Sequence, residues 1–206
     1  MIFYTSKKGA DVVSTQTNYS GRSFAEETLQ GGEYENCRFN GASFASAELK
    51  NVRFMNCNFS FADFSGAVLT GCSFIACVFS GANFFACEVR DCRLNGSSLC
   101  GAELAGVNWY GGQYRDTVFE GCDLRRTDFS GVDASGANFT EANLSRCNFR
   151  NAKLSGAILK NADLTQADLR GADVSRTDLR FAKLNKTKID LEAAVFLASQ
   201  LGCEVG

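Results

Sequence analysis

An apolar residue, large in every repeat except at Ala134, recurs at every fifth position from Tyr19 to Ile189, which gives 35 consecutive repeats without an insertion or a deletion. Phe and Leu together fill 27 of these central positions, and no charged residue occupies any of them. A period of five matches neither the period of about 3.6 residues in a helix nor the period of two in a strand. The chain must therefore turn a corner once per repeat, so that each repeat forms one short, flat wall.

The position two residues before each central residue is also restricted, because it holds 14 Ala and eight Cys residues. Four walls that close a square use one coil of four repeats, and successive coils stack through parallel backbone hydrogen bonds about 4.8 Å apart. Large side chains from four walls then fill the axis and leave room only for small residues beside them. The sequence therefore predicts an all-β solenoid with one large and one small inward residue in each repeat.

Glycine supports this corner geometry, because 15 of its 20 copies lie two positions after a central residue, where a turn with positive φ favours glycine. Like residues recur one coil apart and should stack into ladders along each wall. The first half of the chain is rich in Phe and the second half in Leu, so we expect the two halves to differ in corner or wall geometry. One predicted ladder contains Phe24, Phe44, Phe64 and Phe84, followed by Leu104, Leu124, Leu144, Leu164 and Leu184.

The stretch GANFTEANLSRCNFRNAKLSGAILKNADLTQADLRGADVS resembles the A(D/N)LXX pattern of pentapeptide-repeat proteins. The resemblance extends over residues 17–189 and implies that family's fold, a right-handed quadrilateral parallel β-helix, here with about nine coils. Residues 1–16 precede the repeats, and we interpret them as an N-terminal cap or strand. Residues 190–206 follow the repeats and form a separate C-terminal segment.

The C-terminal segment predicts a short helix, with Asp190 as the N-cap and Gly202 as the stop. One face of this helix is apolar, and we expect that face to cap the last coil, because an open end of a β-helix exposes unpaired edge groups. Phe196 falls on the opposite face, which favours a contact with a second copy of the chain. The predicted capping and dimerisation residues are Leu191, Val195, Phe196, Ala198 and Leu201.

The sequence offers little support for catalysis, because it contains no histidine and no glycine-rich phosphate loop. Eight of the ten cysteines lie in the small inward column. They could bind zinc or act as small buried residues, and we favour the second interpretation because stacked walls do not converge on one tetrahedral point. We therefore predict no enzyme, cofactor or metal site. Cys100 and Cys203 lie outside that column, and either could be reactive.

Two groups of outward residues are candidates for binding a partner. Apolar residues gather on the outward positions within about two coils, and exposed apolar patches mark interaction sites. Carboxylates give the first half a negative potential, whereas residues 123–189 carry eight acidic and 12 basic residues. The apolar candidates are Met55, Phe61, Ile75, Val78 and Phe85, and the acidic candidates are Glu33, Glu35, Glu48, Glu88 and Asp91.

The ending LEAAVFLASQLGCEVG resembles the C-termini of pentapeptide-repeat proteins that protect DNA gyrase, namely the Qnr-type and mycobacterial quinolone-resistance groups and the albicidin-resistance group. This resemblance implies a homodimer formed through the C-terminus and a type II topoisomerase as partner, bound in some relatives by mimicry of duplex DNA. The alternative is a general interaction scaffold that binds an unrelated partner through the apolar patch. We expect no direct binding of nucleic acid or membrane, and a cytoplasmic location because no signal peptide is evident.

Overall fold

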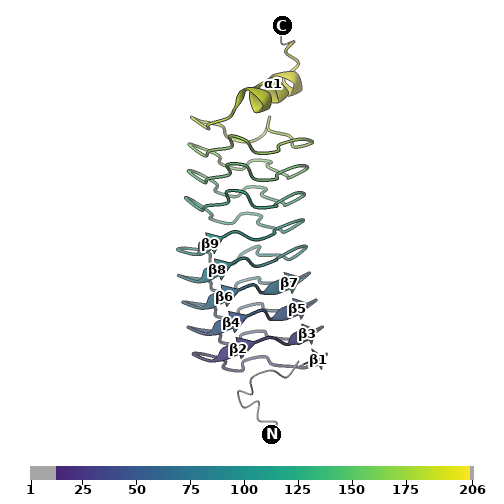
Figure 1. Cartoon of the computed structure of the whole chain (residues 1–206), viewed down its shortest axis with the longest axis vertical. Helices are drawn as coiled ribbons and strands as arrows, with labels where there is room; N and C mark the ends of the chain where they lie inside the picture. Colours follow the sequence, from purple (N-terminus) through teal and green to yellow (C-terminus); the bar gives the residue numbers. More distant parts are fainter. Residues whose placement is uncertain (1–12, 205–206) are drawn as a thin grey trace.

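The chain winds into a rod of stacked coils, and a single helix lies across one end of the rod (Figure 1). This computed structural model describes residues 13–204. Every backbone pairing is parallel and joins residues 20 positions apart, from Val13 with Glu33 to Asp168 with Lys188. The predicted parallel β-solenoid is therefore confirmed.

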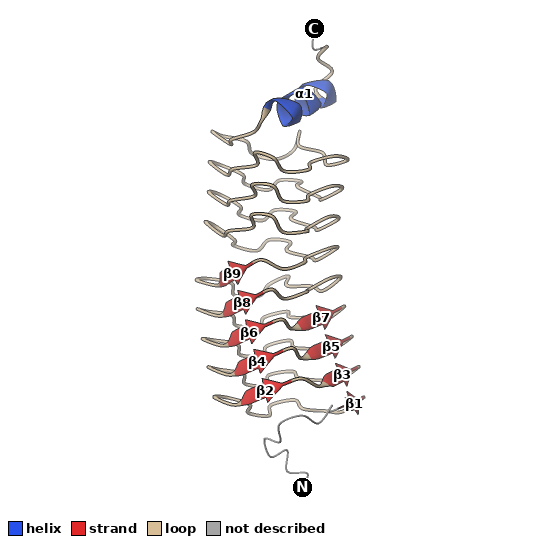
Figure 2. Cartoon of the chain, in the orientation of Figure 1, coloured by secondary structure: helices blue, strands red, loops and turns tan. Residues whose placement is uncertain are grey.

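Short strands form two parallel sheets in the first half of the rod, with the orders β1-β3-β5-β7 and β2-β4-β6-β8-β9 (Figure 2). These strands cover about five turns of the solenoid, and single-residue bridges continue the same register up to Lys188. The elements are β1 (Val13–Thr15), β2 (Thr28–Gln30), β3 (Glu33–Glu35), β4 (Glu48–Lys50), β5 (Arg53–Met55), β6 (Val68–Thr70), β7 (Ser73–Ile75), β8 (Glu88–Arg90), β9 (Asn108–Tyr110) and α1 (Leu191–Gln200).

Each coil has four walls, which we number 1 to 4. The central residues of one wall lie 20 positions apart in the sequence. Strands occur on walls 3 and 4. Wall 1 runs from Tyr19 to Leu179, wall 2 from Phe24 to Leu184, wall 3 from Leu29 to Ile189 and wall 4 from Tyr34 to Val174.

The two halves of the rod differ in their corners. On walls 1 and 2, the carbonyl of each central residue accepts a hydrogen bond from the N–H three residues later, as from Ala42 to Phe39 at 3.0 Å. On walls 3 and 4, none of the described corners before Leu94 has this bond, and strands form there instead. From residue 111 onward the closed corner prevails on all four walls, which confirms the expected difference in corner geometry.

Asn, Asp and Ser residues just before the central position favour the closed corner. Their side chains accept a hydrogen bond from the N–H two residues later, as Asn58 does from Ser60 at 2.9 Å. This local bond holds the backbone in a turn and competes with extended structure. On the early strands, the residues just before the central position are Thr28, Glu33, Glu48 and Arg53. Their side chains do not accept a hydrogen bond from the N–H two residues later. Asp or Asn occupies this position in most repeats of the second half.

Stacked aromatic rings fill the axis of the first half. On wall 2, the rings of Phe24, Phe44, Phe64 and Phe84 lie 4.8 Å apart, with interplanar angles between 3° and 5°. Rings on adjacent walls meet edge to face, as between Phe54 and Phe59 at 5.1 Å and 84°. The Phe part of the predicted ladder is therefore confirmed, and each fully buried ring contributes about 1.5–3 kcal/mol before the entropy cost of ordering it.

Gly112 occupies the small inward position before Tyr114, where most repeats carry Ala or Cys. The Tyr114 ring is fully buried, and its hydroxyl donates to the Gly111 carbonyl at 2.6 Å. A Cβ atom on Gly112 would lie 2.5 Å from the Cys92 carbonyl oxygen and 2.7 Å from the Tyr114 hydroxyl. The buried tyrosine therefore requires glycine at this inward position.

We predict that Gly112→Ala lowers the free energy of unfolding by about 2–3 kcal/mol, because overpacking adds to the strain of a residue at positive φ. Gly121→Ala is the control: Gly121 has a φ of 66°, close to that of the non-glycine corners, against 110° for Gly112, and an added Cβ would meet no atom within 4 Å. The control should cost about 1 kcal/mol. Urea denaturation measures both values, and equal losses for the two variants would contradict the proposed clash.

Candidate functional site

Helix α1 begins and ends where the sequence predicts. The Asp190 side chain accepts a hydrogen bond from the Ala193 N–H at 3.0 Å, which is the expected N-cap bond. The second carboxylate oxygen of Asp190 accepts from the Gly171 N–H at 2.6 Å and so ties the helix start to the last complete coil. Gly202 has a φ of 79°, in agreement with its predicted role as the stop.

The Gln200 side chain joins the end of the helix to the free edge of wall 1. The Leu179 N–H donates to Gln200 Oε1 at 3.1 Å, and Gln200 Nε2 donates to the Thr177 carbonyl at 2.6 Å. One amide side chain therefore pairs a backbone donor and a backbone acceptor that the next coil would otherwise have paired. The helix thus caps the rod by hydrogen bonding as well as by packing.

The two faces of α1 lie the opposite way to our prediction. Ala193 is buried, and Phe196 and Leu197 pack against the core, so the predicted outward contact of Phe196 is wrong. The Asp190 and Gln200 bonds fix the rotation of the helix and turn the face with Ala193, Phe196, Leu197 and Gln200 toward the coil. The residues that we expected to seal the core lie outward instead: Leu191 is 80% exposed, Leu201 63% and Val195 39%, while Ala198 is partly buried.

The predicted apolar patch does not form one continuous surface. Met55 and Ile75 are partly buried register partners on wall 4, whereas Val78 lies on wall 1 and Phe85 on wall 2. Phe61 stands at the corner between walls 1 and 2 and is 74% exposed. The structure therefore divides these candidates among three walls and a corner.

Phe61 differs from most corner residues in the size of its side chain and not in its backbone conformation. Its φ of 60° is shared by other non-glycine corners such as Asn56 and Ala76, although it costs a bulky residue about 1–2 kcal/mol. Its ring covers Gly81, where an added Cβ would lie 2.7 Å from the ring. Phe61 is thus held on the surface by the glycine in the next coil. Two further aromatic residues that we did not predict, Tyr110 and Phe181, are 45% and 59% exposed. Their outward and corner positions in the repeat are the sequence signal that identifies them.

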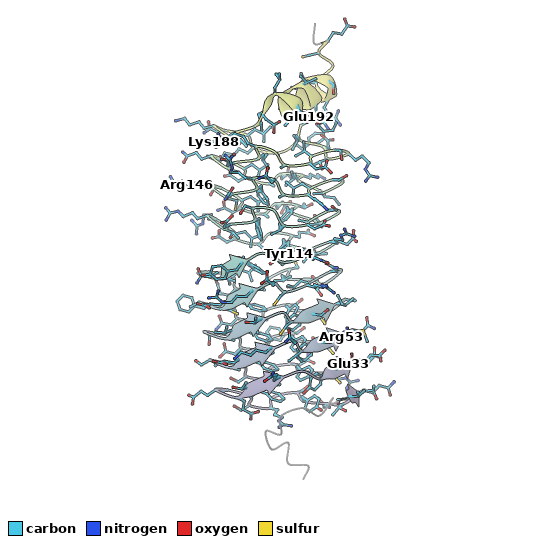
Figure 3. All side chains as sticks on the ribbon, viewed as in Figure 1. Glu33, Arg53, Tyr114, Arg146, Lys188 and Glu192 are labelled. Carbon is cyan, nitrogen blue, oxygen red and sulfur yellow. The ribbon has the colours of Figure 1, made fainter. Side chains whose placement is uncertain are left out.

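The acidic candidates on walls 3 and 4 are largely paired with neighbouring bases. Glu33 lies 3.0 Å from Arg53 on the next coil, and both are labelled in Figure 3. Glu48 pairs with Lys50 at 2.6 Å, and Glu88 pairs with Arg90 at 2.7 Å. Within residues 13–204, no ion pair holds the two remaining acidic candidates, Glu35 and Asp91. The first half therefore presents mixed charge rather than a continuous row of free carboxylates.

The inward cysteines are buried and unpaired, as expected for small core residues, and they also donate hydrogen bonds. The Sγ atom of Cys57 lies 3.3 Å from the Tyr34 carbonyl, and that of Cys72 lies 3.3 Å from the Leu49 carbonyl. Both carbonyls belong to open corners and lack the turn bond. Burial raises the pKa of Cys87 and Cys147 to about 12, so their thiols stay protonated. Ser97 makes the same kind of bond to the Phe74 carbonyl at 2.9 Å.

The two cysteines outside the inward column are exposed, in agreement with the sequence analysis. Within residues 13–204, no three His, Cys, Asp or Glu residues are grouped in a way that could hold a metal ion. Over the same residues, α1 is too short and not apolar enough to span a lipid bilayer.

A sequence profile described as "Pentapeptide repeat region" matches residues 27–103 and 67–139, and a second described as "Pentapeptide repeats (8 copies)" matches residues 147–185 and 157–196. The chain belongs to the pentapeptide-repeat family. No protein among the curated sequences matches it.

Solved structures place this pentapeptide-repeat fold close to that of QnrB1, which is described as a plasmid-mediated fluoroquinolone resistance protein. A trypsin-treated variant of QnrB1 gives a TM-score of 0.81 at 22% identity, over 95% of this chain and 98% of that one. A second trypsin-treated variant gives 0.70 at 21% identity, over 96% and 100%. Full-length QnrB1 gives 0.68 at 21% identity, over 92% and 99%. The similarity concerns the fold.

Ion pairs also join outward positions on successive coils near the end of this pentapeptide-repeat rod. Lys183 donates to Asp163 Oδ2 at 2.8 Å, and the Thr165 N–H donates to Asp163 Oδ1 at 2.9 Å. Hydrogen bonds from Lys183 and Thr165 lower the pKa of Asp163 to about 2, and the Lys183 ammonium has the larger effect. The carboxylate therefore stabilises the folded state at neutral pH.

We predict that Asp163→Asn costs about 0.5–1 kcal/mol at pH 7, because the pair is partly exposed to solvent. The folded pKa lies below the unfolded value, so this contribution is present above about pH 4 and is lost as the pH falls from about 4 to about 2. Chemical denaturation across this range measures the difference between wild type and variant. Lys183→Gln is the matched variant and should return the Asp163 pKa toward its ordinary value, and an unchanged pKa by NMR titration would contradict the assigned cause.

Proposed function

We propose that this pentapeptide-repeat protein is a non-enzymatic, dimeric binding protein that acts on a type II topoisomerase, with DNA gyrase as the first candidate, and protects it from quinolones. The observation that carries the proposal is the agreement in fold with QnrB1 over 95% of this chain, at a TM-score of 0.81. The uninterrupted register supports a binding role, because it adds no loop that could build an enclosed catalytic pocket.

The charge distribution modifies the expected mode of binding. DNA mimicry requires a continuous negative face, since electrostatic contacts dominate DNA affinity. Here Glu33, Glu48 and Glu88 are each paired with a base, and the second half carries excess positive charge. We therefore expect the topoisomerase to recognise the shape of the rod and its exposed side chains. Mimicry of DNA charge should contribute less to the binding affinity.

Gyrase assays test the proposed function directly. We expect micromolar protein to restore supercoiling in the presence of a quinolone and to lower the amount of drug-stabilised cleaved DNA. The same assays without drug measure any inhibition by the protein itself. Absence of an effect on supercoiling and on cleavage, with and without drug, would contradict the topoisomerase assignment and favour the scaffold alternative.

A homodimer is the second part of the proposal, and the outward face of α1 supports it. Leu191, Val195 and Leu201 are exposed and lie on one side of the helix together with the partly buried Ala194 and Ala198. A face of large exposed apolar residues flanked by small ones suits close packing against an identical helix about a twofold axis. Dimerisation would remove this apolar surface from water and would place the two rods end to end.

We predict that the double variant Leu191→Asp and Val195→Asp is a folded monomer, because two carboxylates would be buried in the apolar contact. Light scattering after size exclusion measures the mass, and circular dichroism checks the fold. Glu192→Gln, on the same exposed turn, is the control and should remain dimeric. A monomeric wild type would overturn this part of the proposal.

Phe196→Ala should instead lower the free energy of unfolding by about 2–3 kcal/mol, through lost packing on the core.

The scaffold alternative rests on Phe61, Val78 and Phe85, which are 74%, 38% and 57% exposed. The positive φ of Phe61 is common to most corners of the rod, so its exposed ring is what favours a contact role for this residue. This alternative predicts binding to a protein other than a topoisomerase.

A further inference from the structure

The backbone ladder is interrupted on walls 2 and 3 between two successive coils. On wall 2, bridges join Asn83 to Glu103 and Asp123 to Asn143, but no bridge joins Glu103 to Asp123. On wall 3, β9 pairs with β8 and not with the following coil. Figure 2 shows the coils on the side of β9 farther apart immediately beyond this strand than before it. We call this interruption the slot.

The slot leaves backbone groups on both of its edges without partners. Among the described residues, no acceptor receives the N–H groups of Leu104, Gly106 and Trp109, and none receives those of Asp123 and Asp128. One coil earlier, the corresponding Phe84 N–H donates to the Glu103 carbonyl at 2.8 Å. On walls 1 and 4 the ladder continues past the slot, as between Leu99 and Val118 at 2.9 Å. The slot is therefore open on two adjacent walls and closed on the other two.

Trp109 explains the separation of the coils. Its indole is larger than the rings that stack elsewhere, and it lies tilted at 44° over Phe129, with 6.0 Å between the ring centroids. Stacked Phe pairs on wall 2 are 4.8 Å apart. The inward residues Ala102, Val107 and Thr127 are partly exposed beside the slot, whereas nearly all inward residues along the middle of the rod are buried. The indole thus holds the two coils apart and exposes part of the core.

A hollow of about 380 Å³ opens beside the slot on wall 3. Trp109, which is only 5% exposed, lies in its lining, and its Nε1–H is buried without a hydrogen-bond partner. Within residues 13–204, neither Asp91 nor Asp128 forms an ion pair, although both carboxylates line the hollow. Arg90 is held by Glu88 at 2.7 Å. The complete lining is Thr70, Arg90, Asp91, Trp109, Tyr110, Gly111, Asp128 and Ser130.

We propose that the slot binds an extended peptide segment of a partner protein, and that a Lys or Arg side chain of this segment enters the hollow. Unpaired backbone N–H groups along the two edges of the slot match the backbone of an added β-strand, which is a recurring mode of peptide recognition. Two carboxylates that form no ion pair, those of Asp91 and Asp128, match a cationic side chain by charge. Arg90 already lies over the Tyr110 ring, 4.3 Å from its centroid, so the incoming cation meets the carboxylates rather than that ring. Binding would pair backbone groups that the ladder leaves free. The proposal is independent of the topoisomerase assignment, because its test uses the isolated protein.

Hydrogen exchange of the full chain, followed by NMR, tests the proposal. In the free protein, the amides of Leu104, Gly106 and Asp128 should exchange much faster than that of Phe84. A blocked peptide of alternating Lys and Thr should slow their exchange by about tenfold or more and leave Phe84 unchanged. A peptide of alternating Glu and Thr should protect these amides less, because Asp91 and Asp128 would repel its carboxylates. A peptide of alternating Lys and Pro keeps the charge but loses half of its backbone N–H donors, so it cannot pair with both edges of the slot and should protect them less.

Paired variants separate binding from folding. Asp128→Lys should weaken protection by the Lys–Thr peptide about tenfold, whereas Glu48→Lys on the intact part of the same wall should not. Slow exchange of Leu104, Gly106 and Asp128 in the free protein would show that the slot is closed and would overturn the proposal. Failure of the Lys–Thr peptide to protect these amides, or equal protection by the Glu–Thr peptide, would also overturn it.

Discussion

The parallel backbone ladder with an offset of 20 residues is the interaction on which the rest of the rod depends. It fixes the position of each coil on the one before, and so it brings like side chains into contact every fourth repeat. The stacked rings of Phe24, Phe44 and Phe64 follow from that register rather than from any local preference. Because each coil contacts only its neighbours, a change at one coil stays local, and the slot beside Trp109 can exist within an otherwise regular rod.

Both ends of such a ladder leave unpaired backbone groups, and the chain resolves this problem at its C-terminus with side chains. Gln200 pairs with the Thr177 carbonyl and the Leu179 N–H, and Asp190 pairs with the Gly171 N–H. These bonds also decide which face of α1 remains free. The exposed apolar residues Leu191 and Leu201 are therefore a consequence of edge capping, and the same geometry that closes the rod offers a surface for a second copy.

The polar residues near the core act through the backbone rather than through chemistry of their own. Inward Cys, Ser and Thr side chains donate to the carbonyls of the previous coil, as Cys57 does to Tyr34 and Ser97 does to Phe74. Outward Asp and Asn residues just before the central position accept a backbone N–H and close the corner, as Asn58 does. Periodic cysteines and aspartates, which in another fold would suggest ligands or acids and bases, here follow from the hydrogen-bonding needs of the corners.

The sequence by itself determined the solenoid, the inward and outward positions of nearly every residue, and the bounds of α1, because a five-residue period and an N-cap are local patterns that only one geometry satisfies. The rotation of α1 was decided only by tertiary structure, since its two faces were both partly apolar and the choice depended on Gln200 reaching an edge formed by Thr177 and Leu179. The slot could likewise not be predicted from the sequence, because the five-residue repeat continues unbroken through Trp109. The indole separates the two coils by its size, and this effect arises only when one coil stacks on the next.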